Sequence, residues 1–309
     1  MPLAPAHSLD AIQVGDTPLL DVSFAFPELG RKVSVLGKAE WHNPGGSIKD
    51  RAGWYIFRDA IESGKLTKGK VLLDSSSGNT GIAYAWLAAR LGFKVSLAVP
   101  GSISKQRRAL LEAYGVELLF TDPLEGSDGA IREARLLLQA EPGRYFYADQ
   151  YSNPMTWRAH YETTAPEIFS QTEGLVTHFV AGLGTGGTFV GAGRRLRELK
   201  PGVRLVSVEP DGPLHGLEGL KHMATSLVPA IYDPAVADSK LEVSTDEAQG
   251  AARILARKGG LLLGPSGGAN LAAAVRLGRS LAESGREAVV VTVFPDAGER
   301  YLGERFWTP

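Results

Sequence analysis

The chain has 309 residues, of which 44% are hydrophobic and 22% charged, and its formal net charge at pH 7 is -1. This balance is typical of a folded protein with one large or two modest domains, and it excludes disordered and fibrous proteins. Because the chain has no basic excess, we expect no nucleic-acid partner. The absence of cysteine excludes disulfides, thiolate metal sites and a cysteine nucleophile.

The hydropathy of the chain and its first residues bear on its cellular location. No stretch approaches the roughly 18 to 20 consecutive apolar residues of a membrane span, so we expect no membrane partner. The opening segment, MPLAPAHSLDAIQVGD, lacks the basic and apolar regions of a secretory signal. The sequence therefore predicts a cytoplasmic protein.

Short runs rich in Val, Leu and Ile alternate with longer helical patterns, which is typical of βα units around a parallel sheet. In chain order, the predicted strands cover residues 33–38, 70–74, 94–99, 116–121, 145–148, 178–182, 204–209, 260–264 and 288–294. Most of these runs are apolar throughout, so we expect helices on both faces of the sheets. The predicted fold class is α/β, with mostly parallel sheets flanked by helices.

Helical patterns fill the intervals between these strands. The predicted helices cover residues 50–62, 79–91, 104–114, 129–139, 188–199, 247–258 and 270–283. Ser244 and Glu247 have the spacing of a capping box. Left-handed helix ends are expected at Gly64, Gly92, Gly115 and Gly259. Residues 151–155, which include Ser-Asn-Pro, are the candidate passage between two domains.

Glycine is over-represented, since 37 glycines in 309 residues is about 12%, against a usual figure of roughly 7%. Beyond the helix ends, the excess gathers with Ser, Thr and Asn in four segments, residues 43–51, 75–81, 182–188 and 264–270. Three of these segments directly follow a predicted strand and precede a helix. Such turns lie together at the carboxyl ends of strands, where ligands bind, so we expect one shared site.

The segment 182–188 has the chemistry of an anion site. Its glycines let backbone N–H groups approach an anion, and the N-terminus of the following helix adds partial positive charge. The hydroxyls of Thr185 and Thr188 add neutral donors.

The same segment also matches the dinucleotide pattern G-x-G-x-x-G, at Gly182, Gly184 and Gly187. Glu209 ends the next predicted strand, near the place of a ribose-binding acidic residue. A nucleotide-binding dehydrogenase that uses 182–187 and Glu209 is therefore the alternative from another class, although it leaves the other three segments unexplained.

Lys49 differs from the other lysines because it leaves a glycine turn at the predicted start of a helix, with Asp50 and Arg51 after it. The helix N-terminus and Arg51 should lower the pKa of this amine, which then serves as a nucleophile or base. A phosphate cup and an activated lysine at one sheet edge point to a phosphorylated carbonyl cofactor held as a Schiff base. Pyridoxal phosphate is the obvious candidate.

With this cofactor, the two remaining segments, residues 75–81 and 264–270, are candidates for binding the substrate and the cofactor ring. Residues 75–81 offer backbone donors and hydroxyls suited to an amino-acid carboxylate, and Asn79 is placed to bond a ring hydroxyl. Ser266, in a tight turn within 264–268, would face the pyridine nitrogen. A serine there leaves that nitrogen neutral, which suits elimination and replacement at Cβ better than transamination.

With these residues the chain resembles, nearly from end to end, the cysteine synthase and cystathionine β-synthase family of fold-type-II pyridoxal-phosphate enzymes. The lysine motif N-P-G-G-S-I-K-D-R at residues 43–51 is similar to the family's N-P-T-G-S-x-K-D-R, with Gly for Thr. The substrate loop S-S-G-N-T-G at 76–81 and the phosphate loop G-T-G-G-T at 184–188 match the family's loops. Further matching motifs lie at residues 15–19, 149–154, 264–268 and 298–302.

The resemblance implies a pyridoxal-phosphate-dependent transferase of amino-acid biosynthesis, closest to cysteine synthase, that forms L-cysteine from O-acetylserine or O-phosphoserine and sulfide. Lys49 would hold the cofactor and move the Cα proton, and a lyase-like β-elimination would give an aminoacrylate to which sulfide adds. The implied cofactor-binding residues are Lys49, Asn79, Gly184, Thr185, Gly186, Gly187, Thr188 and Ser266. The implied substrate-binding residues are Ser76, Ser77, Asn79, Thr80 and Gln150.

The resemblance also implies a fold like that of the tryptophan synthase β subunit and a homodimer. The smaller N-terminal α/β domain would cover residues 44–153. The larger C-terminal α/β domain would combine residues 1–43 with 154–309 and carry the phosphate-binding loop.

The donor and the acceptor stay open in the sequence. Lys221 is a candidate partner for the phosphate of O-phosphoserine, with a solvated helix lysine as the plain alternative. Cystathionine β-synthase with homocysteine as acceptor, serine or threonine deaminase, and a non-catalytic regulator are alternatives on the same fold. The histidines show no metal-binding spacing, so no metal is expected.

Overall fold

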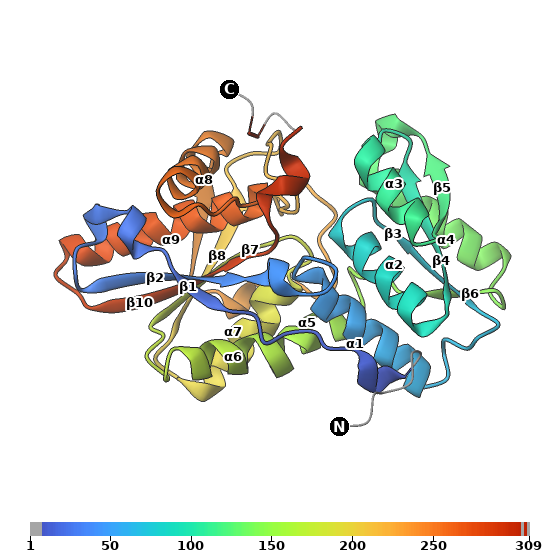
Figure 1. The fold of residues 1–309 in the computed structure, drawn as a ribbon, viewed down its shortest axis with the longest axis horizontal. Helices are drawn as coiled ribbons and strands as arrows, with labels where there is room; N and C mark the ends of the chain where they lie inside the picture. The colour runs from blue at the N-terminus through green and yellow to red at the C-terminus, as the bar shows by residue number, and fades with distance from the viewer. Residues whose placement is uncertain (1–7, 304–305, 308–309) are drawn as a thin grey trace. The chain divides into compact units, whose positions relative to one another are not determined.

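The computed structural model describes residues 8–303 and 306–307, and the chain forms two compact units (Figure 1). The smaller unit comprises residues 49–156 together with 8–14, and the larger comprises 15–48 with the described part of 157–309. The sequence predicts domains at residues 44–153 and at 1–43 plus 154–309. That these domains fold independently stays a prediction. The units differ from them at residues 8–14, 44–48 and 154–156.

A parallel sheet with strand order β5-β4-β3-β6 forms the centre of the smaller unit. Its elements are α1 (Lys49–Glu62), β3 (Val71–Ser75), α2 (Asn79–Leu91), β4 (Lys94–Pro100), α3 (Lys105–Ala113), β5 (Glu117–Thr121), α4 (Gly126–Ala140) and β6 (Tyr145–Tyr147). Ala130 and Ala134 of α4 pack with Leu73 and Ala98 in one apolar cluster. Because β3 and β6 are parallel neighbours, the segments that follow them leave the sheet at the same edge.

The sheet of the larger unit has the order β1-β2-β10-β7-β8-β9, with β1 antiparallel to β2 and the other pairs parallel. Its strands are β1 (Leu19–Asp21), β2 (Val33–Ala39), β7 (His178–Gly182), β8 (Arg204–Pro210), β9 (Ser239–Val243) and β10 (Ala288–Phe294). Its helices are α6 (Ala165–Gln171), α7 (Gly187–Leu199), α8 (Thr245–Gly259) and α9 (Pro265–Glu283). Helix α5 (Met155–Ala159) lies where the chain crosses between the units and continues as a π-helix over His160–Thr164.

Helices cover both faces of this larger sheet, as its uninterrupted apolar strands predict (Figure 1). Along β7, Phe179 and Ala181 pack in a cluster with Phe189 of α7, whereas Val180 packs in a second cluster with Leu271 of α9. Side chains of a strand alternate between its faces, so one apolar strand supplies both cores.

The predicted α/β class with mostly parallel sheets is confirmed. The predicted bounds of β7, β10 and α2 match the structure, and so does the capping box of Ser244 and Glu247. The predictions missed the short strands β1 and β9 and the helical run from α5 through α6. Strand β9 carries exposed Ser, Lys and Glu and lies at a sheet edge, so its apolar signal is weak.

Three predictions near the end of α8 are wrong. Residues 260–264 form no strand, because Leu263 makes only an isolated bridge with Ala297, and α9 begins at Pro265 rather than at 270. Proline is favourable at the first helical position, but the two glycines after Ser266 have low helix propensity, so the sequence pattern did not indicate a helix there. The left-handed end of α8 is Gly260, with φ of 65°, rather than Gly259.

Candidate active site

Lys49 is the first residue of α1, and its side chain is half-buried. The next residue, Asp50, is fully buried and accepts a hydrogen bond of 2.9 Å from the indole N–H of Trp86 on α2. A carboxylate in the first turn is favourable because the helix N-terminus carries partial positive charge. This bond fixes the start of α1, and with it Lys49, against α2.

The glycine turn before Lys49 belongs to the larger unit. Arg300 donates a hydrogen bond of 2.5 Å to the carbonyl oxygen of Gly45. Gly46 has φ of 76°, and a Cβ there would lie 2.4 Å from Nη2 of Arg300. The left-handed backbone favours glycine at this position, whereas the Arg300 guanidinium is the end of a flexible side chain that can shift.

The predicted substrate loop, residues 75–81, leads from the end of β3 into α2. The hydroxyl of Ser76 accepts hydrogen bonds from the N–H groups of Gly78 at 3.3 Å and Gly81 at 3.1 Å, which makes the turn compact. A Cβ at Gly81 would lie 2.5 Å from the carbonyl oxygen of Ser76, so the turn needs glycine there. Gly78 has no side chain to cap α2, but the Ser76 hydroxyl engages the amide of Gly81 in its first turn, and the partial positive charge of the helix N-terminus suits an anion there.

Gln150 holds both ends of this loop in the smaller unit. Its Nε2 donates to the carbonyl oxygen of Ser75 at 3.2 Å, and its Oε1 accepts from the hydroxyl of Thr80 at 2.7 Å. Gln150 and Thr80 are both buried, whereas Ser76, Ser77 and Asn79 are half-buried. The structure thus brings the predicted substrate-binding residues together in one connected loop.

Asp74, the residue before the loop, was missed by the sequence analysis. It is fully buried, and burial raises the pKa of its carboxyl group to about 7. Its carboxylate accepts hydrogen bonds from the N–H of Ser75 at 2.8 Å and from the N–H of Gln150 at 3.3 Å. The one signal in the sequence was an acidic residue at the end of an otherwise apolar strand.

The predicted phosphate loop follows β7 in the larger unit and leads into α7. Gly186 has φ of 86°, and a Cβ at Gly184 would lie 2.3 Å from the carbonyl oxygen of Gly219. Gly186, the residue before α7, has no side chain to cap the helix, and the hydroxyl of Thr185 accepts a hydrogen bond of 3.3 Å from the first helical amide, that of Gly187. The amides of Thr188 and Phe189 follow as donors at the helix N-terminus. These donors, together with the buried Thr185, fit a phosphate group.

His160 is a second residue that the sequence analysis missed. This buried side chain lies in the π-helix, with Nδ1 2.9 Å from the hydroxyl of Thr164 and Nε2 3.2 Å from the hydroxyl of Thr188. Single π-turns within helices often mark functional sites. Because 28 residues separate His160 from Thr188, no local pattern signals the contact.

Ser266 lies in the first turn of α9, which corrects the predicted tight turn, and its side chain is buried. One turn later, Asn270 donates from Nδ2 to the carbonyl oxygen of Val293 at 2.8 Å. Its Oδ1 is buried without a hydrogen-bond partner among the described residues. A Cβ at Gly182 would lie 2.9 Å from that oxygen, so the start of α9 and the end of β7 are in close contact.

Two further candidates are Lys221, in the segment between β8 and β9, and Glu209, near the end of β8. The backbone N–H of Lys221 donates to the carbonyl oxygen of Leu183 at 2.8 Å, which ties this non-helical segment to the phosphate loop. Glu209 is buried and accepts a hydrogen bond of 3.1 Å from the N–H of Met223. Because the Glu209 carboxylate is buried and binds the backbone of Met223, its position does not favour binding to the hydroxyls of a ribose.

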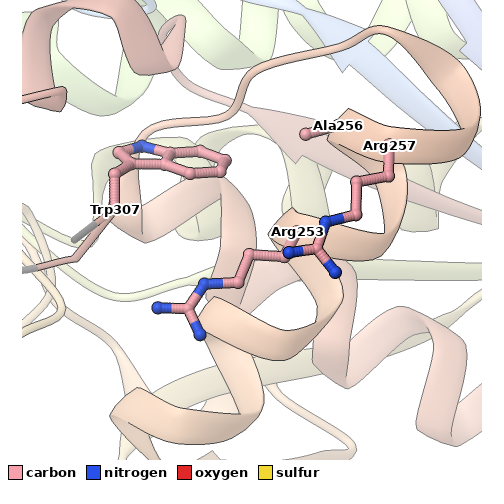
Figure 2. Close-up of a pocket in the computed structure, with 4 residues that line it drawn as sticks. All are labelled: Arg253, Ala256, Arg257 and Trp307. Atoms are coloured by element: carbon pink, nitrogen blue, oxygen red, sulfur yellow. The ribbon is translucent and has the colours of Figure 1, made fainter. Parts of the chain in front are cut away.

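Within the described part of the chain, no group of three or more His, Asp and Glu side chains is arranged to hold a metal ion. No described helix is long and apolar enough to span a membrane. A surface pocket of about 240 Å³ is lined by Arg253, Ala256, Arg257 and Trp307 (Figure 2). Its lining includes none of the predicted site residues.

Residues 11–296 match the family described as "Pyridoxal-phosphate dependent enzyme". The chain belongs to this family. It is 48% identical to the cysteine synthase of Aquifex aeolicus over 290 residues, which cover 94% of this chain and 89% of that protein. The cysteine synthase of Entamoeba histolytica has a similar structure, with a TM-score of 0.91, 32% identity and coverage of 100% of this chain and 94% of that one.

A third relative in the family differs in its reaction. The O-acetylserine-dependent cystathionine β-synthase of Helicobacter pylori has a TM-score of 0.87 and 34% identity, and covers 98% of this chain and 99% of that one. Family membership confirms the predicted pyridoxal phosphate cofactor and enzyme class. It also removes the reason to interpret residues 182–187 as a nicotinamide site.

Proposed function

We propose that this member of the family is a cysteine synthase, which forms L-cysteine from an O-activated serine and sulfide. The observation that carries the proposal is the 48% identity to the Aquifex aeolicus cysteine synthase along almost the whole chain. The loop geometry supports it, because each unit has a glycine-rich loop that leads into a helix N-terminus. One of these suits a cofactor phosphate and the other an amino-acid carboxylate.

The proposed cofactor-binding residues are Lys49, Asn79, Ser266 and the loop 184–188. Pyridoxal phosphate, when bound, supplies an aldehyde for amino groups and an electron-withdrawing ring that acidifies the Cα proton. The amides at the start of α7 would hold its phosphate, because Gly184 and Gly186 leave the backbone uncovered. Ser266 would offer a neutral hydroxyl to the ring nitrogen, and Asn79 an amide to the ring hydroxyl.

Lys49 would bind the cofactor aldehyde, and its amine would take the Cα proton of the substrate and later return it. The substrate carboxylate would accept hydrogen bonds from the start of α2 and from Ser76 and Ser77. Gln150 and Thr80 would act mainly by holding the loop, because each uses its side chain within it. Departure of the activated hydroxyl group and addition of sulfide at Cβ would complete the replacement.

Product analysis tests this proposal. We expect the cofactor-loaded protein to form cysteine from sulfide and O-acetylserine or O-phosphoserine. Lys49→Ala should lower the rate about 10³-fold by removing the base. Lys65→Ala is the matched control, since that side chain is 62% exposed and should leave the rate unchanged. Cystathionine from homocysteine at a higher rate, or 2-oxoacid from serine or threonine alone, would assign one of the alternatives instead.

Lys221 provides the test of the donor. Its Nζ lies 3.4 Å from the carbonyl oxygen of Leu227, and its ammonium group has the charge to bind a substrate phosphate. If O-phosphoserine is the donor, Lys221→Ala should raise the KM for O-phosphoserine and leave that for O-acetylserine unchanged. Equal effects on both donors would exclude this role for Lys221.

We also propose a cytoplasmic homodimer, in line with the composition and the family resemblance. Light scattering of the purified protein should give a mass near twice the 32.9 kDa of one chain. A mass of one chain at micromolar concentration would contradict the dimer.

A further inference from the structure

We propose that Asp74 is a positioning residue that holds the substrate-carboxylate loop in its binding geometry through the backbone of Ser75 and Gln150. The proposal rests on the proposed function of that loop. Asp74 lies near the end of β3, directly before the loop, and its carboxylate contacts the backbone at Ser75, the last residue of β3, and the backbone after β6 at Gln150. From there it reaches both chain segments that shape the loop.

The hydrogen bonds of Asp74 form the base of a connected network. One carboxylate oxygen accepts from the N–H of Ser75 at 2.8 Å and the other from the N–H of Gln150 at 3.3 Å. Gln150 in turn holds both ends of the loop, because its side chain donates a hydrogen bond to the Ser75 carbonyl oxygen and accepts one from the Thr80 hydroxyl. The hydroxyl of Thr156 also fixes the Gln150 carbonyl at 3.0 Å.

An ionised carboxylate suits this network because it is an acceptor at both oxygens. Protonation converts one oxygen into a donor, so a neutral Asp74 cannot accept well from both N–H groups. The loop amides that would bind the substrate carboxylate are then less well ordered. Substrate affinity should therefore depend on the charge of Asp74, although Asp74 does not touch the substrate.

The surroundings of Asp74 bring the pKa of its carboxyl group close to neutral pH. Burial is the main cause, and the charge of Asp149 also raises the pKa, while N–H donors and the Tyr84 hydroxyl lower it, with a net value of about 7. The titratable groups that face Asp74 are Tyr84 from α2, Tyr147 from β6, and Asp149 and Tyr151 from the segment after β6, with Arg135 of α4 facing Tyr147.

Unsatisfied polar atoms mark the same region. Four buried side-chain atoms of the smaller unit have no hydrogen-bond partner among the described residues: Ser75 Oγ, Tyr84 Oη, Tyr147 Oη and Asp149 Oδ1. The Tyr84 hydroxyl therefore lowers the pKa of Asp74 from nearby, without a hydrogen bond of ordinary geometry. Asp149 also has a left-handed backbone, with φ of 45°, directly before Gln150. Buried polar atoms of this kind are costly, and their concentration around one carboxyl group is typical of a functional region rather than of a passive core.

Asp74→Asn tests the proposal, because the amide has nearly the same shape but cannot accept at both ends. In the wild type, the KM for O-acetylserine should rise about tenfold between pH 8 and pH 6, as the proton binds with a pKa of about 7. In Asp74→Asn, the KM should be high at both pH values, while kcat changes much less. Titration of the substrate itself affects both proteins equally, so the ratio of their KM values isolates Asp74.

Tyr84→Phe is the matched variant. It removes a hydroxyl that lowers the pKa of Asp74 and leaves the two backbone hydrogen bonds intact. The pH dependence of KM should therefore persist and move to higher pH. A KM in Asp74→Asn that is as low and as pH-dependent as in the wild type would overturn the proposal, as would an unshifted profile in Tyr84→Phe.

Hydrogen exchange of residues 75–81 gives a readout that needs no reaction. At pH 8 the loop amides should exchange faster in Asp74→Asn than in the wild type. Tyr84→Phe should lie between the two, because its raised Asp74 pKa leaves more of that carboxyl group neutral at pH 8. If the wild type makes no cysteine while this difference is seen, the proposed function fails and the positioning role stands. If cysteine forms but exchange is the same in all three proteins, the positioning role fails. Should Asp74→Asn not fold, the pH profiles of the wild type and Tyr84→Phe decide.

Discussion

Hydrogen bonds between residues far apart in sequence shape both proposed anion loops. Asp74 supports the loop in the smaller unit, and His160 contacts Thr188 in the loop of the larger unit. A neutral imidazole has one donor and one acceptor, so its two hydroxyl neighbours, Thr164 and Thr188, satisfy it completely. Each loop thus combines a glycine backbone with a buried polar side chain that orients it.

We predict that His160→Phe weakens the binding of pyridoxal phosphate about fivefold to tenfold. The change removes the bond that orients the Thr188 hydroxyl, and one hydrogen bond contributes about 1 kcal/mol. Titration of the cofactor-free protein, followed by the visible absorbance of the bound cofactor, measures the dissociation constant. His160→Gln keeps a donor and an acceptor and should bind closer to the wild type. Equal affinity in the wild type and His160→Phe would show that the contact is irrelevant to the phosphate.

At the scale of elements, close packing explains why glycine is abundant inside helices as well as in loops. Gly268 in α9 would place a Cβ 2.7 Å from the carbonyl oxygen of Ala248 in α8, so the two helices touch through their backbones. Gly250, also in α8, has no atom within 4 Å of an added Cβ. Both glycines lie within a helix and precede an alanine, but an added Cβ would meet a backbone atom at Gly268 and open space at Gly250.

We predict opposite effects of alanine at these two positions. Gly268→Ala should lower the free energy of unfolding by about 1 to 3 kcal/mol, because the helices must separate or strain. Gly250→Ala should raise it by up to about 1 kcal/mol, because alanine favours the helix. Urea unfolding followed by circular dichroism measures both. Destabilisation by Gly250→Ala equal to that by Gly268→Ala would contradict the packing argument.

The elements also show what the sequence could predict. Strands such as β7 and β10, apolar on both faces, and the four glycine-rich segments carry local signals, so their positions were predictable. The start of α9 was not predictable, because Gly267 and Gly268 oppose a helix locally and the need for Gly268 comes only from its packing against Ala248 of α8. Asp74 and His160 were also not predicted as site residues, because their hydrogen-bond partners are distant in sequence or belong to the backbone.

At the scale of the whole molecule, the proposed site residues are divided between the two units. Lys49, the loop 75–81 and Gln150 belong to the smaller unit, and the loop 184–188, Lys221 and Ser266 to the larger. A ligand stabilises the part of a protein that binds it, through mass action on the folded form. The two proposed anion loops should therefore respond separately to a simple anion and together to the cofactor.

We predict that inorganic phosphate and pyridoxal phosphate protect different parts of the cofactor-free chain from hydrogen exchange. Phosphate should slow exchange in α7, which begins at the phosphate loop, and leave α1 unchanged, because Lys49 needs the aldehyde of the cofactor. Pyridoxal phosphate at 100 times its dissociation constant should stabilise its site by about 2.7 kcal/mol, or roughly 100-fold slower exchange, in both helices. In Lys49→Ala the protection of α1 should be lost while that of α7 persists in part. Equal protection of α1 by phosphate and by the cofactor would contradict the assignment of Lys49, because phosphate has no group that an amine can bind covalently.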